Sequence, residues 1–250
     1  MTNLSNAQID RLGDRLRGNT LTEQDLRMLD DYRRSFGEAH ETVVATIRDQ
    51  LQLEPTGRPA KSTISLIEKL HRESIRLAQV QDIAGCRIVV TDVSEQESVV
   101  ASLRGIFPQA SVIDRRAAPS YGYRAVHIVV KISGMLVEIQ VRTLLQHLWA
   151  EISERLSDVL DPEIKYGGGD ELTRKVLRTT SESVAKIEDV EMDILKIEHK
   201  AVGLPKEQIQ ETVTPQLLAL RGRLADQKKE MREQFDRVIA ATEKREGRAS

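Results

Sequence analysis

Residues 137–143, with the sequence VEIQVRT, alternate apolar and polar side chains without interruption. Strict alternation is typical of a β-strand that buries one face. The other face of this strand would carry a carboxylate, an amide and a guanidinium from Glu138, Gln140 and Arg142. A solvated strand surface and a binding site can both present such a trio, so this pattern alone leaves the two interpretations open.

The same kind of pattern predicts a small sheet in the middle of the chain. Short runs rich in β-branched residues predict strands near residues 86–92, 111–115, 123–132 and 135–143. A Ser-Gly pair between the last two strands predicts a β-hairpin. Helical spacing of apolar residues lies between and beyond these runs. We therefore expect an α/β fold with a mixed sheet of four to five strands, flanked by helices.

The spacing of apolar residues predicts helices at both ends of the chain. Residues 5–54 predict two helices, the segment EPTGRP at 54–59 breaks the pattern, and residues 61–80 resume it. Beyond three glycines at 167–169, the chain is predicted to be helical to its end. We divide it into N-terminal helices at 1–56, a core at 57–166 and a helical C-terminal extension at 167–250.

The last predicted helix carries apolar residues seven positions apart, at Leu217, Leu224, Met231 and Val238. This spacing is a weak signal for a coiled coil or for helix packing. Two interpretations remain open. The helix could fold back on the chain's own core, or it could form the interface of a homo-oligomer.

Charge and composition restrict the function. The formal net charge of -2 argues against a protein whose whole surface grips nucleic acid, although a local basic patch would still be allowed. The single cysteine, Cys86, cannot form an intramolecular disulfide or a multi-cysteine zinc site, and we assign it to packing. No apolar run approaches membrane-spanning length, and the polar start has no signal-peptide core. We expect a cytoplasmic protein with no membrane partner.

A basic stripe is the first candidate for chemistry. From Thr56 to Arg76 there are five basic residues and two acidic ones. Lys61, Ser65, Lys69 and Arg72 follow one another at helical spacing, which predicts one shared helix face. Cations and hydroxyls at the start of a helix suit polyphosphate binding, and they also suit a solvated surface.

Three other short segments add groups that can act on a nucleotide. Asp82 leads into the first predicted strand, where a single carboxylate can hold Mg²⁺ while substrate phosphates fill other coordination sites. Gly85 allows a close backbone approach in that strand. The segment DRRAAPSYGYRAVH offers arginine and tyrosine side chains, whose flat faces can stack on purine rings. Glu138 could bind a metal or take a proton from a hydroxyl.

Together, four segments resemble the synthetase domain of the RelA/SpoT family. KSTISLIEKL, DIAGCRIVV, GYRAVH and VEIQVRTLLQHLWAE occur in the family's order and at roughly its spacing, over about residues 57–166. The resemblance implies a nucleotidyltransferase-like fold. It also implies a Mg²⁺-dependent pyrophosphokinase that transfers the β,γ-pyrophosphate of ATP to the 3′-hydroxyl of GDP or GTP, making (p)ppGpp alarmones. Such a transfer depends on positioning and charge neutralisation more than on covalent chemistry.

The resemblance also assigns roles to individual residues. Asp82 and Glu138 would hold Mg²⁺, with Glu138 as the second metal carboxylate or as the base for the 3′-hydroxyl. Arg115 or Arg116 would stack on adenine, and Tyr123 on the acceptor's guanine. The implied ATP-binding residues are Arg58, Lys61, Ser65, Lys69, Arg72, Arg87, Arg115 and Arg116. The implied acceptor-binding residues are Tyr123, Arg124, His127, Gln140 and Arg142.

Structural roles compete with these assignments. Arg87 and Arg142 could instead pair with Asp82 and Glu138, and His127 could be a buried core histidine. Of two residues on the helix that follows the last predicted strand, Trp149 is assigned to the core, whereas His147 stays undecided.

The chain departs from the family pattern at two places, and the second of them leaves the acceptor open. Arg58 lies three residues before Lys61, where the family usually has a cation two residues before. The loop before Gly-Tyr-Arg lacks the Lys-Pro-Asn usual in small alarmone synthetases. A toxic relative that uses an adenosine nucleotide or the tRNA 3′ end, with a neutralising partner, is therefore an alternative. A non-catalytic nucleotide-binding interaction protein is another. Neither a hydrolase domain nor the long regulatory C-terminus of full-length family members is expected.

Overall fold

The computed structural model describes residues 4–18 and 21–249, and it describes side chains as far as residue 242. The chain forms two compact units, each assembled from three segments. The first unit contains Met1–Ile88, Ala101–Ile113 and His127–Gln140. The second contains Val89–Val100, Asp114–Val126 and Val141–Ser250. These two units interleave along the chain. The division into three consecutive domains that we expected from the sequence stays a prediction.

Five strands form one sheet in the order β1-β2-β5-β4-β3. Their bounds are β1 (Thr56–Arg58), β2 (Ala84–Val90), β3 (Ser111–Asp114), β4 (Val126–Ile132) and β5 (Met135–Thr143). The mixed α/β fold and the β4–β5 hairpin are confirmed, and the strands lie within a few residues of the predicted ranges. β1 was not expected, because it lies in the EPTGRP break, where it pairs antiparallel with β2 and places Gly57 opposite Cys86.

The first unit holds the N-terminal helices α1 (Asn6–Arg17), α2 (Glu23–Arg34) and α3 (Gly37–Leu51). The prediction of two helices before residue 54 was therefore wrong. α1 and α2 each begin with a capping box, in which Ser5 pairs with Gln8 and Thr22 pairs with Asp25. Such a cap fixes a helix start, because it satisfies backbone donors that have no partner inside the helix.

α4 (Thr63–Arg72) is shorter than the helix predicted over 61–80. Arg17 of α1 donates hydrogen bonds to the carbonyl oxygens of Leu70, at 2.9 Å, and of Ile75. Glu73 is already extended, and a short 3₁₀ turn follows at Leu77–Gln79. A side chain far away in the sequence therefore satisfies one carbonyl near the end of α4 and another just beyond it, and helical spacing within 61–80 could not reveal this.

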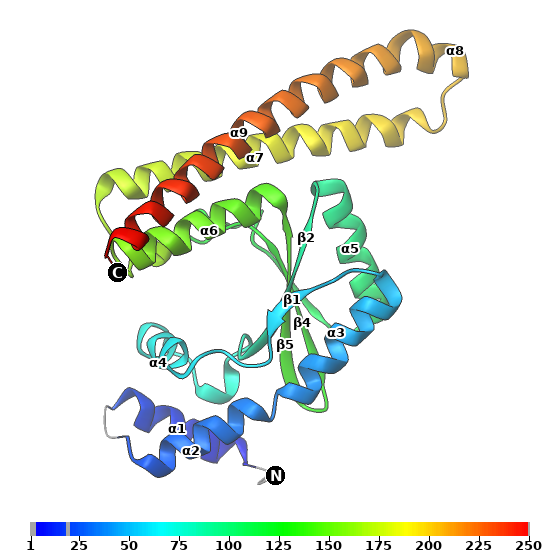
Figure 1. Ribbon diagram of the computed structural model, residues 1–250. Helices are drawn as coiled ribbons and strands as arrows, with labels where there is room; N and C mark the ends of the chain where they lie inside the picture. The colour runs from blue at the N-terminus through cyan, green and yellow to red at the C-terminus, as the bar shows by residue number, and fades with distance from the viewer. Residues whose placement is uncertain (1–3, 19–20, 250) are drawn as a thin grey trace. The chain divides into compact units, whose positions relative to one another are not determined.

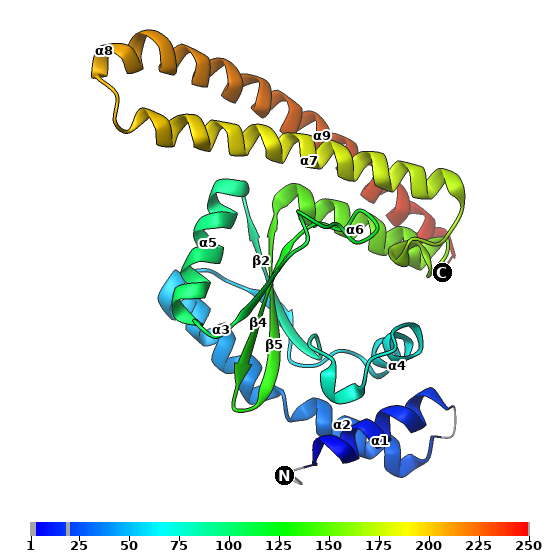
Figure 2. The same ribbon diagram turned by 180° about the vertical axis from the view of Figure 1, so that it is seen from behind.

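The second unit is built on a helical hairpin that packs on α6 (Leu144–Val159). A turn at Ile164–Tyr166 leads into α7 (Glu171–Ala201), and α8 (Lys206–Gln208) and a π-helical turn connect it to α9 (Thr214–Ala249). Figures 1 and 2 show α7 and α9 running side by side in opposite directions. The helix α5 (Val93–Ile106) follows β2, and its residues are divided between the two units.

The apolar side of this hairpin faces the second unit's own core. Leu224 and Met231 of α9 pack against a buried cluster that includes Trp149 and Phe235, whereas Val238 is exposed. Packing within the chain therefore accounts for Leu224 and Met231, two of the four residues in the seven-residue spacing, and an oligomer interface stays a prediction. Trp149 is 4% exposed, which confirms its assignment to the core.

Cys86 of β2 is 3% exposed, as its assignment to packing requires. Burial raises the pKa of its thiol to about 12, so the thiolate is not formed at neutral pH. In the described part of the chain, no helix combines the length and the apolar character needed to cross a membrane.

Candidate active site

Asp82 and two lysines form the first part of the candidate site, inside the first unit. Lys61 Nζ lies 2.8 Å from Asp82 Oδ2, and Lys69 Nζ lies 2.9 Å from Asp82 Oδ1. Burial acts to raise the pKa of Asp82, but the charges and hydrogen bonds of Lys61 and Lys69 outweigh it and lower the pKa to about 2. Asp82 is therefore ionised at neutral pH, and both of its oxygens are occupied by ammonium groups.

Backbone contacts fix the position of Lys61. The backbone N–H of Lys61 donates to the carbonyl oxygen of Ile83 at 2.6 Å. The Arg33 side chain of α2 donates to the carbonyl oxygen of Lys61, also at 2.6 Å. Arg33 also reaches Thr63 Oγ1 at 3.0 Å, beside the start of α4. Sequence reasoning missed Arg33, because the bond to Lys61 spans 28 residues and leaves no periodic signal.

The structure confirms only part of the helix face predicted for Lys61, Ser65, Lys69 and Arg72. α4 begins at Thr63, so Lys61 lies before the helix. Ser62 caps the helix by accepting a hydrogen bond from the Ser65 N–H at 3.2 Å. Lys61 and Lys69 still converge, because both contact Asp82. Arg72, at the end of α4, lies 3.2 Å from Glu73.

Glu138 is the centre of a second polar group, made from neighbouring strands. His127 Nδ1 of β4 lies 2.9 Å from Glu138 Oε1 of β5, and Gln140 Nε2 donates to Glu138 Oε2 at 2.7 Å. A carboxylate can only accept hydrogen bonds, so Nδ1 of His127 carries a proton in this contact. His127 is buried, as one of the two interpretations of the sequence expected, and it contacts the candidate catalytic carboxylate.

The environment of Glu138 keeps it ionised. Burial acts to raise its pKa, but the hydrogen bond and charge of His127 and the hydrogen bond of Gln140 lower it below the ordinary value. The charge of Asp82 acts in the opposite direction and raises the pKa of Glu138. An ionised carboxylate with a low pKa is a weak base, so it suits cation binding or orientation of a hydroxyl better than full proton uptake.

Gly85 brings β2 close to β5, as its sequence position suggested. A Cβ atom at Gly85 would lie 2.9 Å from the carbonyl oxygen of Glu138. Under 3.0 Å a real Cβ atom would force this backbone to shift. Gly85 therefore permits the strand spacing that holds Glu138 in place.

The two carboxylates fit Mg²⁺ that arrives with a phosphate-bearing substrate. Mg²⁺ is commonly held by one or two carboxylates together with substrate phosphates. Among the described residues, no group of three or more His, Cys, Asp or Glu side chains is placed to hold a metal ion. Phosphate oxygens and water would have to complete the coordination of such an ion, and metal binding by Asp82 and Glu138 stays a prediction.

Tyr123 and Arg142 make a separate arrangement in the second unit. The Arg142 guanidinium donates to the Tyr123 hydroxyl through Nε at 3.2 Å and through Nη2 at 2.9 Å. Its Cζ lies 4.9 Å from the centroid of the Tyr123 ring. Arg142 is 4% exposed, whereas Tyr123 is half-buried, so a buried cation fixes an aromatic ring that still reaches the surface.

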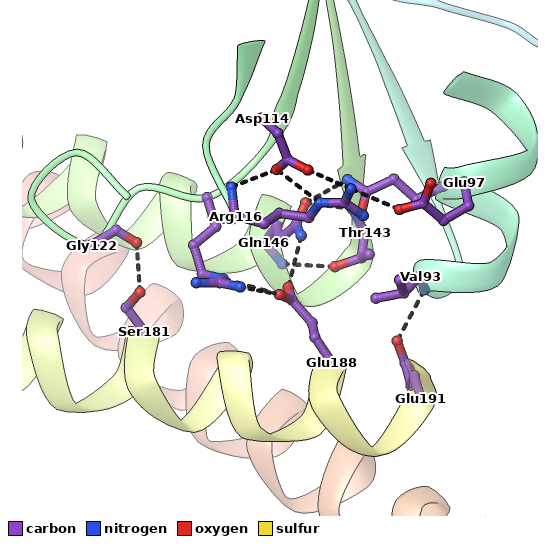
Figure 3. Close-up of polar contacts among 12 residues, drawn as sticks. Val93, Glu97, Asp114, Arg116, Gly122, Thr143, Gln146, Ser181, Glu188 and Glu191 are labelled. Atoms are coloured by element: carbon purple, nitrogen blue, oxygen red, sulfur yellow. Dashed lines mark hydrogen bonds and ion pairs between the residues drawn. The ribbon is translucent and has the colours of Figure 1, made fainter. Parts of the chain in front are cut away.

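The two arginines proposed for adenine stacking differ in their surroundings. The Arg116 guanidinium lies 2.7 Å from Asp114, 2.7 Å from Glu97 and 3.0 Å from the Gln96 side-chain oxygen. Figure 3 shows Arg116 between Asp114 and Glu97. Arg115 contributes its backbone N–H to the carbonyl oxygen of Ala125 at 2.9 Å. Since Arg116 is committed to acidic partners, the stacking prediction now rests on Arg115.

Arg124 is held by a residue that sequence reasoning missed. Its guanidinium donates two hydrogen bonds to Glu188 of α7, at 3.0 and 2.6 Å. Gln146 of α6 donates to the other oxygen of Glu188 at 2.7 Å. The sequence does hold a signal for Glu188, because this carboxylate falls on the apolar stripe of α7 beside Val184. A charge on a buried face requires a partner.

The chain is similar to several known proteins. The family described as "Region found in RelA / SpoT proteins" matches residues 57–157. The Mycobacterium tuberculosis protein "Uncharacterized protein Rv1366" is 36% identical over 139 residues, which cover 51% of this chain and 50% of that relative. This chain therefore spans about half the length of the mycobacterial relative it matches. "GTP pyrophosphokinase YjbM" of Bacillus subtilis is 33% identical over 150 residues, covering 54% of this chain and 67% of that protein.

The chain is also similar in structure to solved proteins. The crystal structure of small alarmone synthetase 1 from Bacillus subtilis superposes with a TM-score of 0.50 at 28% identity, covering 72% of this chain and 100% of that one. A second structure of that protein, bound to its product pppGpp, superposes with a TM-score of 0.50 at 28% identity, covering 71% and 98%.

Proposed function

The chain belongs to the RelA/SpoT family, and from this premise we propose that it is a pyrophosphokinase that makes guanosine alarmones. It would transfer the β,γ-pyrophosphate of ATP to the 3′-hydroxyl of GDP or GTP. The observation that carries the proposal is the paired arrangement in the first unit, where Lys61 and Lys69 hold Asp82 while His127 and Gln140 hold Glu138. The relative with a GTP pyrophosphokinase name supports the guanine nucleotide as acceptor.

The cations would act on the donor nucleotide. Lys61 and Lys69 exchange their contacts with Asp82 for phosphate oxygens of ATP, and Asp82 is then free to hold the accompanying cation. Arg72 of α4 and Arg87 of β2 are the further cations that we assign to the donor phosphates. Mg²⁺, when bound, supplies charge neutralisation for the triphosphate. Pyrophosphoryl transfer needs this electrostatic balance more than it needs a covalent intermediate.

Glu138 would orient the attacking hydroxyl. The ionised carboxylate accepts a hydrogen bond from the 3′-hydroxyl, and His127 and Gln140 keep it in one conformation. The new ester bond forms between the 3′-oxygen and the β-phosphorus of ATP. The bond between the α- and β-phosphates breaks, AMP leaves, and the hydroxyl proton passes to solvent.

The test is a transfer assay with several acceptors. The purified chain is incubated with ATP labelled at the γ-phosphate, with or without Mg²⁺, and with GDP, GTP, AMP or tRNA in separate reactions. We expect label on GDP or GTP, one AMP released for each labelled product, and no transfer when EDTA replaces Mg²⁺. Label on AMP or tRNA instead would establish the toxic-relative alternative. No transfer to any acceptor would favour an interaction protein.

A further inference from the structure

Two hydrogen-bonding contacts from α7 bracket Tyr123 in the second unit. Ser181 Oγ donates to the carbonyl oxygen of Gly122 at 2.6 Å, one residue before Tyr123. Glu188 accepts two hydrogen bonds from the guanidinium of Arg124, one residue after it. Figure 3 shows Ser181 and Glu188 rising from the same helix toward this loop. The loop that carries Tyr123 is therefore fastened on both sides to α7.

The Glu188 contact is buried and charge-assisted. The Arg124 side chain is 12% exposed and that of Glu188 is 6% exposed. Gln146, which donates to Glu188, also accepts a hydrogen bond from the backbone N–H of Thr143 at 3.0 Å. Glu188 thus connects the loop to the end of β5, immediately after Arg142, which bonds the Tyr123 hydroxyl. Charge-assisted bonds in a desolvated setting are stronger than neutral ones, so this connection is well suited to hold one geometry.

The turn at Gly122 is also tightly packed. Gly122 has a φ of +93°, and an added Cβ would lie 2.8 Å from Cζ2 of Trp149 and 3.3 Å from Cβ of Ser181. A positive φ and this lack of space both require glycine. The backbone before Tyr123 is therefore confined between α6 and α7, and Arg142 fixes the far end of the ring.

We propose that α7 is a positioning element for acceptor binding, acting through Glu188 and Ser181 on the orientation of Tyr123. The inference rests on the proposed function, in which Tyr123 stacks on the base of the acceptor. It extends that function beyond the segment that the family matches, because α7 begins at Glu171 and the match ends at residue 157. Glu188 and Ser181 touch no substrate in this scheme, and their effect passes through Tyr123.

Glu191 provides a matched control on the same helix. It is 7% exposed, like the 5% of Glu188, and it is also a buried carboxylate with a cationic partner. It accepts hydrogen bonds from the Val93 N–H at 2.9 Å and from Lys228 Nζ at 2.8 Å, and it makes no described contact with the loop. Glu188→Gln and Glu191→Gln therefore remove the same charge at equal depth, and only one of them removes a loop contact.

The kinetic test measures donor and acceptor separately for both variants. We expect Glu188→Gln to lower kcat/KM for GDP by about tenfold or more, mainly through KM, because a misplaced stacking partner weakens acceptor binding. KM for ATP should change by less than about twofold. Glu191→Gln should leave kcat/KM for GDP within about twofold of wild type. Equal losses of kcat/KM for GDP in both variants would overturn the proposal, since Glu188 would then support only the fold.

Hydrogen exchange gives a readout that does not depend on activity. Mass spectrometry of peptides from residues 114–126 should show faster amide exchange in Glu188→Gln and in Ser181→Ala than in Glu191→Gln. Unchanged exchange in both loop variants overturns the positioning role, and so does faster exchange with unchanged kcat/KM for GDP. If the wild-type chain transfers pyrophosphate to no acceptor, the proposed function fails, and the exchange comparison still decides whether α7 holds the loop. Ser181→Ala keeps the test open should Glu188→Gln not fold.

Discussion

Replacing Asp82 with asparagine should reduce stability in a way that depends on pH. Asp82 is 23% exposed and lies within 3 Å of two ammonium groups, those of Lys61 and Lys69. Asparagine keeps the size and an acceptor oxygen but removes the charge. The loss should therefore report the electrostatic part of these contacts, and it should disappear under conditions where wild-type Asp82 is itself neutral.

The size of the effect follows from the pKa of Asp82. The pKa falls from an ordinary 3.8 to about 2 in the folded protein. A difference of nearly two units corresponds to about 2.5 kcal/mol of stability at neutral pH. Because the folded pKa is the lower one, this contribution is complete above the unfolded value of 3.8 and is lost as the pH falls toward 2. About half of it should remain at roughly pH 3.

Urea unfolding of wild type and Asp82→Asn at pH 6 and pH 3 measures this difference. Circular dichroism follows unfolding of the whole chain, and the fluorescence of Trp149 follows unfolding around that residue. Coincident transitions from the two signals indicate two-state unfolding. Asp193→Asn is the control, because Asp193 pairs with Lys196 where both side chains are 63% exposed, and the loss there should stay below about 0.5 kcal/mol. A difference for Asp82→Asn that is equal at both pH values, or no difference at all, would refute the electrostatic reasoning.

Two further variants test the chemistry. Glu138→Gln should abolish transfer and leave ATP binding detectable by titration. The free energy of unfolding should also fall by about 1–3 kcal/mol, because the new amide donor would face the donor of His127 or of Gln140. Near wild-type turnover in this variant would remove Glu138 from the mechanism. Tyr123→Ala should weaken acceptor binding by roughly 5- to 150-fold, since stacking of a base on an aromatic ring is worth about 1–3 kcal/mol. Tyr121→Ala is the control, and it should leave acceptor affinity unchanged because the Tyr121 ring is 65% exposed. If Tyr123→Ala weakened ATP binding as much as acceptor binding, Tyr123 would support the fold and not the acceptor.

Local patterns in the sequence determined the sheet and its buried face. The alternation over 137–143 predicted a strand that β5 confirms, because period-two side chains must point to opposite sides of a strand, and the bounds predicted for it, 135–143, are those of β5. The Ser-Gly pair predicted the hairpin, and Ser133 and Gly134 both adopt the positive φ values that a tight two-residue turn requires. Gly85 and Cys86 were also assigned correctly, since a small or apolar residue inside a strand has few alternatives.

Only the tertiary structure decided which charged groups meet. Arg116 and Arg124 were both predicted to face nucleotides, yet Arg116 is held by Asp114 and Glu97, and Arg124 by Glu188 at a sequence separation of 64. A guanidinium has the same sequence signature whether it binds a phosphate or a buried carboxylate. The difference lies in desolvation, because a carboxylate on the inner face of a packed helix cannot stay unpaired. Which arginine reaches it depends on where α7 packs against residues 114–126 of the same unit, and no periodicity within either segment encodes that contact.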